Sequence, residues 1–164
     1  MKINQTVRRI RKRQHGIYAI EFAIYGSLFF LLLFTIIELG RLFFVWNVLT
    51  EATRRGARLA TVCHLDQIAV TAYTDMLNTA LFNNLTIVPN LTATNLNIQY
   101  LGLNGMPATD FNSIHLVRAT ITNYQHQLLI PGLGMTLNSP SFSTTLPRES
   151  LGVTRYKYTQ CAPI

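Results

Sequence analysis

The chain has 164 residues, and its 14 Lys and Arg against 7 Asp and Glu give a formal net charge of +7. Hydrophobic residues make up 49% of the chain and charged residues 13%, about half the charged share of an average soluble domain. This composition excludes a disordered polyelectrolyte, and two cysteines are too few for a disulfide-rich scaffold.

The positive charge lies almost entirely in the first 16 residues. Six basic residues and no acidic residue precede Gly16. From Ile17 onward the chain has 8 basic and 7 acidic residues, a balance of +1. The net charge therefore belongs to a short N-terminal leader, and the charge of the remaining chain does not indicate a nucleic-acid partner.

An apolar run of 21 residues, from Ile17 to Ile37, follows the leader, with Glu21 as its one ionisable group of consequence. As a helix, a run of this length spans roughly 31 Å, close to the hydrocarbon thickness of a bilayer. It is longer than the roughly 7–15 residues of a cleaved secretory signal and does not end in a small-x-small site. The run therefore predicts a membrane-spanning helix over about residues 17–38.

The basic flank also predicts the direction of this helix across the membrane. Positively charged flanks stay on the cytoplasmic side, so we expect residues 1–16 to be cytoplasmic and the chain after Glu38 to lie outside. Four arginines on the far side weaken this asymmetry a little: Arg41, Arg54, Arg55 and Arg58.

Glu21 is the residue that does not fit an ordinary membrane span. An unpaired carboxylate inside a membrane helix costs about 2.5–3.5 kcal/mol on insertion scales, so such a group is a functional candidate. The alternative is that Glu21 lies close enough to the interface to reach water. If the chain were cut after Gly16, the new α-ammonium of Ile17 would lie one helical turn from Glu21, and the two charges could neutralise each other.

This arrangement resembles the processing site of type IV pilin-like proteins. A basic leader ends at Gly16, apolar Ile17 follows, and Glu21 and Phe22 stand at the fifth and sixth positions after the glycine. In that family a prepilin peptidase cuts after the glycine, and the glutamate supports processing and subunit packing.

A longer stretch, over about residues 13–63, resembles the TadE-like pseudopilins of the Tad (Flp, tight-adherence) pilus system. The Glu21-Phe22 pair is followed by Gly40-Arg41 and by the segment A-T-R-R-G-A-R-L-A at residues 52–60. Tyr18 and Tyr25 depart from the small or aliphatic residues common at their positions, and they leave the processing motif intact.

The resemblance implies a minor pseudopilin that assembles or initiates a Tad pilus, used in adhesion and surface colonisation. It implies a single-pass protein of the bacterial inner membrane, with a cytoplasmic N-terminus and a periplasmic C-terminal domain. The expected partners are prepilin peptidase, other pilins and pseudopilins, and pilus assembly components. Whether the protein stays in the membrane, enters the pilus or is released is left open. The alternative is an unprocessed, membrane-anchored periplasmic binding or scaffold domain.

The helix itself is expected to run from residue 17 to residue 62, with a periplasmic extension over 39–62. Small residues at 19, 23 and 27 lie at i, i+4 and i+8, a spacing that lets membrane helices pack closely or, alternatively, leaves small side chains facing lipid. These residues are Ala19, Ala23 and Ser27. The extension is predicted to be amphipathic, with an apolar stripe formed by Leu42, Val45, Leu49, Ala52, Gly56 and Leu59.

Residues 63–164 are predicted to form a small periplasmic α+β domain. Helical spacing covers 66–82, and alternating patterns predict strands at 96–100, 115–124 and 141–146, with a turn at Asn104-Gly105. Helices followed by antiparallel strands indicate an α+β, pilin-like fold with a long N-terminal transmembrane helix.

Cys63 and Cys161 both lie on the expected oxidising side of the membrane. A disulfide between them would tie the end of the long helix to the C-terminal tail and would contribute about 4–5 kcal/mol in the chain-entropy model, less in practice. Two buried free thiols are the alternative.

Signals of enzymatic function are weak. His64, His115 and His126 do not have the spacing of a metal motif and are expected to be surface or hydrogen-bonded residues. Four carboxylates could in principle pair as acid and base in a membrane-tethered hydrolase, but structural roles are favoured: Asp66, Asp75, Asp110 and Glu149. We therefore expect no enzymatic activity, cofactor, metal or small-molecule substrate.

Overall fold

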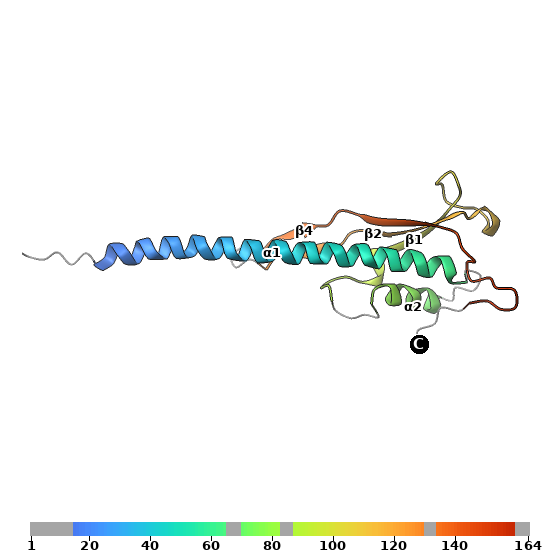
Figure 1. The fold of residues 1–164 in the computed structure, drawn as a ribbon, viewed down its shortest axis with the longest axis horizontal. Coiled ribbons are helices and arrows are strands. Elements are labelled where there is room, and N and C mark those ends of the chain that lie inside the picture. The colour runs from blue at the N-terminus through green and yellow to red at the C-terminus, as the bar shows by residue number, and fades with distance from the viewer. Residues whose placement is uncertain (1–14, 65–69, 83–86, 130–133, 160–164) are drawn as a thin grey trace, which may run out of the picture. The chain divides into compact units, whose positions relative to one another are not determined.

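The computed structural model describes residues 15–64, 70–82, 87–129 and 134–159 (Figure 1). The chain divides into two compact units, Met1–Ile37 and Glu38–Ile164. One helix, α1 (His15–Val62), supplies the described part of the first unit and continues into the second. The second unit adds the helix α2 (Val70–Ala80) and two antiparallel sheets.

Helix α1 is 48 residues long because its sequence offers helix-forming residues without interruption. It contains no proline, and the serine and threonine hydroxyl groups of the apolar run are bonded to the helix backbone. Ser27 Oγ donates to the carbonyl of Ile24 at 2.9 Å, and Thr35 Oγ1 donates to that of Leu31 at 2.8 Å. These bonds satisfy polar groups that would otherwise be costly in an apolar surrounding.

The larger sheet has three strands in the order β1 (Leu96–Leu101), β2 (Leu116–Ile121) and β5 (Phe142–Pro147). Its register places Ala119 of β2 opposite Ile98 on one side and Thr144 on the other. The smaller sheet is a pair, β3 (Gln125–Gln127) and β4 (Thr136–Asn138), in which His126 faces Leu137. Short 3-10 turns precede β1 and β2, at Ala93–Asn95 and Phe111–Ser113.

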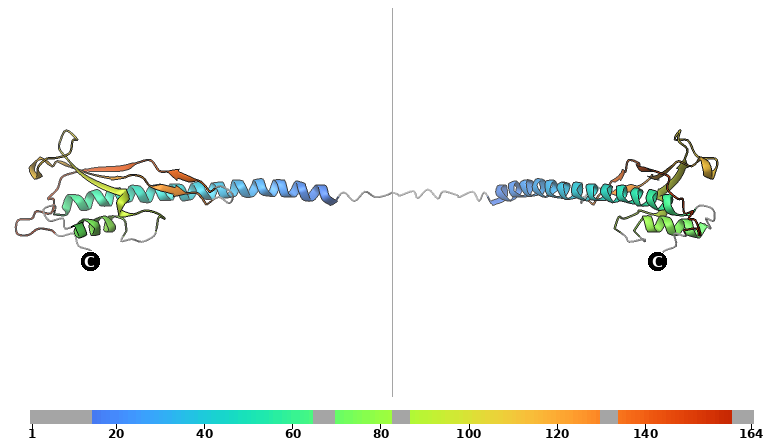
Figure 2. Two further views of the ribbon diagram at one scale, coloured as in Figure 1. Left: turned by 180° about the vertical axis from the view of Figure 1, so that it is seen from behind. Right: turned by 45° about the vertical axis from the view of Figure 1, so that its right-hand side comes forward.

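The core of the second unit is formed by α1, the three-stranded sheet and α2. Alternate residues of β2, namely Val117, Ala119 and Ile121, are 0% exposed, as expected for a strand with one buried face. The apolar stripe expected on the extension of α1 is confirmed, since Leu49 and Ala52 are also 0% exposed. The sheet and α2 lie on opposite sides of this half of α1 in each view (Figure 2).

The α+β class expected from the sequence is confirmed, with differences at the ends of elements. The strand expected over 115–124 stops at Ile121, because the chain turns at Asn123, whose φ of 57° is incompatible with a strand. The turn at Asn104-Gly105 is present, with Gly105 at φ 75°. Within the helix expected over 66–82, the described part is Val70–Ala80, and residues 66–69 lie outside the described residues. The β3–β4 pair was not predicted.

Candidate functional site

The expected processing motif lies in the first turns of α1. Gly16 follows His15, the first helical residue, and a Cβ at Gly16 would meet no other atom within 4 Å. Ile17 is 65% exposed and Phe22 79% exposed, and the side chain of Glu21 is exposed between them. The helix thus presents the motif at its surface, open to another protein or to lipid.

The small residues Ala19, Ala23 and Ser27 are also exposed on α1. Their spacing of four residues places them along one side of the helix, as the sequence predicted. Nothing in the structure shows what covers them, so their role in helix packing stays a prediction.

Large apolar side chains are exposed on every side of the helix along the apolar run. Consecutive residues such as Leu31 and Leu32 are 55% and 57% exposed, which a water-soluble helix would avoid. Within the described residues, α1 is the one helix long and apolar enough to cross a membrane, over Gly16–Val62. These properties fit a single-pass membrane protein.

A cluster of charged and polar side chains begins where the apolar run ends. We call Glu38, Arg41 and His126 the Glu38 cluster. Glu38 Oε1 lies 2.5 Å from a terminal guanidinium nitrogen of Arg41 and 3.2 Å from Nε2 of His126. Arg41 Nε lies 3.2 Å from both carboxylate oxygens, and Arg41 also donates to the backbone carbonyl of Gln127.

Two members of the Glu38 cluster are buried, and the third is half-buried. Glu38 is 7% exposed and His126 is 2% exposed, while the side chain of Arg41 keeps 27% of its surface in contact with solvent. A buried carboxylate is tolerated only where it is paired and hydrogen-bonded, and both conditions are met here. Its hydrogen bonds and ion pairs hold β3 against the part of α1 that directly follows the apolar run.

Tyr124 helps to hold β3 in this position. It is 2% exposed, and its hydroxyl donates to the carbonyl of Pro89 at 3.0 Å. Burial raises the pKa of the Tyr124 phenol, an effect that the nearby charge of Arg41 partly opposes. The phenol therefore stays protonated near neutral pH and remains a hydrogen-bond donor.

Sequence reasoning missed the Glu38 cluster as a unit. His126 was expected to be surface or hydrogen-bonded, and it is hydrogen-bonded, but its partner lies 88 residues away. The spacing of Glu38 and Arg41, three residues apart on a helix, was a signal for their pairing. No local pattern pointed to His126, because its contact with α1 depends on the tertiary fold.

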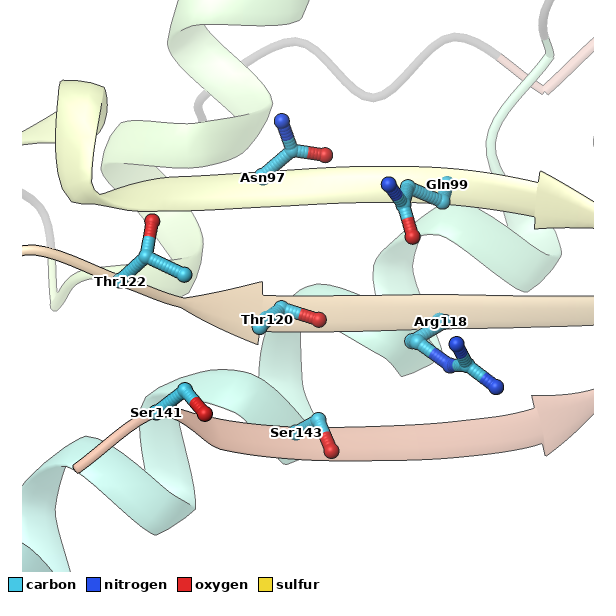
Figure 3. A pocket seen from close by; sticks show the side chains of 7 residues that line it. All are labelled: Asn97, Gln99, Arg118, Thr120, Thr122, Ser141 and Ser143. Atoms are coloured by element: carbon cyan, nitrogen blue, oxygen red, sulfur yellow. The ribbon is translucent and has the colours of Figure 1, made fainter. Parts of the chain in front are cut away.

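A polar hollow of about 350 Å³ lies on the face of the three-stranded sheet (Figure 3). Amide and hydroxyl groups and one cation, Arg118, line it. The lining residues belong to β1, to β2 and the residue after its end, and to β5 and the residue before its start. Arg118 Nε lies 3.2 Å from Thr145 Oγ1, so part of its bonding capacity is used within the sheet. The lining residues are Asn97, Gln99, Arg118, Thr120, Thr122, Ser141 and Ser143.

The carboxylates considered for a hydrolase do not line this hollow. Asp75 lies on α2, Asp110 precedes the 3-10 turn Phe111–Ser113, and Glu149 follows β5, while Asp66 lies outside the described residues. In the described parts of the chain, no group of three or more His, Cys, Asp or Glu residues could hold a metal ion.

Cys63 directly follows the last residue of α1 and is 6% exposed. Its expected partner, Cys161, lies outside the described residues. The disulfide between them therefore stays a prediction.

In a comparison with known protein families, residues 16–58 match the family of TadE-like proteins. This segment begins at Gly16, contains Glu21 and Phe22, and ends at Arg58. Searches of curated proteins and of solved structures found no match. The family suggests involvement in Tad pilus systems and association with their membrane components, and the long apolar helix fits such a protein. Residues 16–58 of this chain are therefore similar to the TadE-like proteins, the family that its sequence motifs predicted.

Proposed function

We propose that this protein is a minor pseudopilin that helps to assemble or initiate a Tad-type pilus. The observation that carries the proposal is the coincidence of the family match with the processing motif. The match starts at Gly16, and Ile17, Glu21 and Phe22 follow on an exposed helical surface. A protein with this role acts by packing and docking, and it needs no catalytic residues of its own.

In this proposal, residues 1–16 orient the helix with its N-terminus in the cytoplasm and are then removed by prepilin peptidase. Removal of 16 residues from a chain of 164 would leave 148, beginning at Ile17. The new α-ammonium and the Glu21 carboxylate would lie one helical turn apart. Their mutual neutralisation, within one chain or between adjacent chains, lowers the cost of holding either charge in lipid.

The exposed stripe of Ala19, Ala23 and Ser27 would then allow close lateral contact between helices. The second unit would lie in the periplasm and dock on other components of the pilus machinery. The inner membrane, prepilin peptidase and other pilins or pseudopilins are the partners of this mechanism.

Gel mobility of the wild type and of Gly16→Arg, each expressed with the matching peptidase, tests the proposal. We expect the wild type to lose the leader and Gly16→Arg to keep it, because a bulky cation would stand at the bond to be cut. Wild type expressed without the peptidase is the control and should migrate with Gly16→Arg. If the wild type keeps its full length with the peptidase present, the protein is instead an unprocessed, anchored scaffold.

A further inference from the structure

The β3–β4 pair exposes large apolar side chains. Leu129, which follows β3, is 64% exposed; Met135, which precedes β4, is 55% exposed; and Leu137, within β4, is 41% exposed. The backbone amide of Leu128 donates to the carbonyl of Met135 at 3.0 Å, so the pairing extends beyond the strands themselves. We call Leu129, Met135 and Leu137 the hairpin surface.

The position of the hairpin surface along α1 is fixed by the Glu38 cluster. His126 of β3 lies 3.2 Å from Glu38, and the carbonyl of Gln127 accepts a hydrogen bond from Arg41. The backbone amide of Leu129 also bonds to the Glu38 carboxylate. Glu38 directly follows Ile37, the last residue of the apolar run, so the hairpin surface is bonded to α1 at the residue that comes next in sequence after that run.

The sequence around the hairpin surface carries no charge that lipid would exclude. From Ala119 to Pro147 there is no Asp, Glu, Lys or Arg. The one histidine of this stretch, His126, is buried against Glu38. Exposed apolar side chains in a segment that has no Asp, Glu, Lys or Arg of its own are suited to the boundary between headgroups and acyl chains.

A second exposed apolar pair in the same unit provides a contrast. Leu103 and Met106, in the connection between β1 and β2, are 79% and 64% exposed. This connection follows the end of the sheet at which Leu101 pairs with Leu116, and Leu116 pairs there with Pro147 of β5. Four residues after Pro147, the backbone amide of Leu151 donates to the carbonyl of Thr61 on α1. Thr61 is 20 residues beyond Arg41, roughly 30 Å along the helix.

We propose that the hairpin surface inserts into the outer leaflet of the membrane that α1 crosses. The inference rests on the membrane span of the proposed function. Phe43 and Phe44, which are 56% and 53% exposed one to two turns after the apolar run, would lie at the same interface. The domain would then be held to the bilayer at two points, the helix and the hairpin, which restricts its tilt and rotation.

Lipid quenching of single tryptophans tests this inference. The chain has one tryptophan, Trp46, and its indole N–H makes no hydrogen bond within the described residues. Trp46→Phe therefore removes the native tryptophan without removing a hydrogen bond among those residues. In that background, Met135→Trp and Leu129→Trp report on the hairpin surface at two exposed positions. Leu103→Trp is the matched control, and Phe30→Trp, at a position 54% exposed in the apolar run, reports on the span. The full chain is reconstituted in phosphatidylcholine vesicles with acyl chains brominated near the headgroup.

We expect Met135→Trp and Leu129→Trp to be quenched several-fold more strongly than Leu103→Trp. If they are quenched no more than Leu103→Trp while Phe30→Trp is quenched, the hairpin surface faces water or a protein partner, and this inference is overturned without harm to the proposed function. If Phe30→Trp is also unquenched, the membrane span fails and the inference fails with it. Matching melting temperatures of the variants show that all four are folded.

Discussion

Two glutamates on α1 differ sharply in their surroundings. Glu21 is exposed on the apolar run, whereas Glu38 is 7% exposed and bonded to Arg41 and His126. Glu38 is therefore placed to hold the protein's own fold together, and Glu21 is placed to act on something outside the isolated chain. The two residues call for different measurements.

For Glu38 the measurement is the free energy of unfolding of the full chain in detergent. Glu38→Ala leaves Arg41 and His126 without their buried partner, and loss of one member of a buried pair costs about 3–5 kcal/mol. We expect a loss near the low end of that range, because the Arg41 side chain is 27% exposed.

The control is Glu51→Ala, which removes the other Glu–Arg pair on α1. Glu51 and Arg55 are 3.1 Å apart, and both side chains are 46% exposed. Exposed helical pairs of this kind are worth about 0.3–0.5 kcal/mol. Equal destabilisation by the two substitutions would contradict the structural role assigned to the Glu38 cluster.

For Glu21 the measurement is membrane insertion followed by leader removal and pilus assembly. Glu21→Ala makes the run more apolar, so we expect the variant to insert at least as well as the wild type. It should then fail in processing or assembly, because the α-ammonium of Ile17 loses its partner one turn away. Normal processing and normal piliation by Glu21→Ala would refute the pairing argument.

Among the elements, α1 and the three-stranded sheet were predictable from sequence because local patterns determine them. The apolar run and the stripe containing Leu49 and Ala52 follow helical periodicity, and Val117, Ala119 and Ile121 alternate as a half-buried strand does. The β3–β4 pair was not predictable in this way. Each of its strands has three residues, and its place depends on the contact between His126 and Glu38, far apart in the sequence.

The contact between α1 and the sheet depends on Gly56. A Cβ at this position would lie 3.3 Å from Leu96 Cδ2 and 3.5 Å from the Cβ of Ala119. A larger side chain would push helix and sheet apart, and overpacking of this kind costs about 1–3 kcal/mol. We expect Gly56→Leu to lower the free energy of unfolding by about that amount.

Gly40→Leu is the matched substitution on the same helix. A Cβ at Gly40 would meet no other atom within 4 Å, so the new side chain has room. Leucine also favours the helix by up to about 1 kcal/mol over glycine. If Gly40→Leu lowered the free energy of unfolding as much as Gly56→Leu does, the destabilisation by Gly56→Leu would not come from packing against the sheet.

For the whole molecule, the net charge of +7 comes almost entirely from the residues that precede Gly16. The chain from Ile17 onward has a balance of +1, and the remaining positive charge precedes the motif at which the family match begins. The sequence therefore predicted the candidate processing site directly, since a charge step, a glycine and an acidic residue lie close together in the chain. It did not predict the Glu38 cluster or the hairpin surface, because both arise only when β3 folds back on α1.

N-terminal sequencing of the protein purified from cells that contain the matching peptidase tests the central claim most directly. The proposed function predicts that the first residue is Ile17, followed by Tyr18, Ala19, Ile20 and Glu21. A protein that begins at Met1, or at any position other than Ile17, would contradict it.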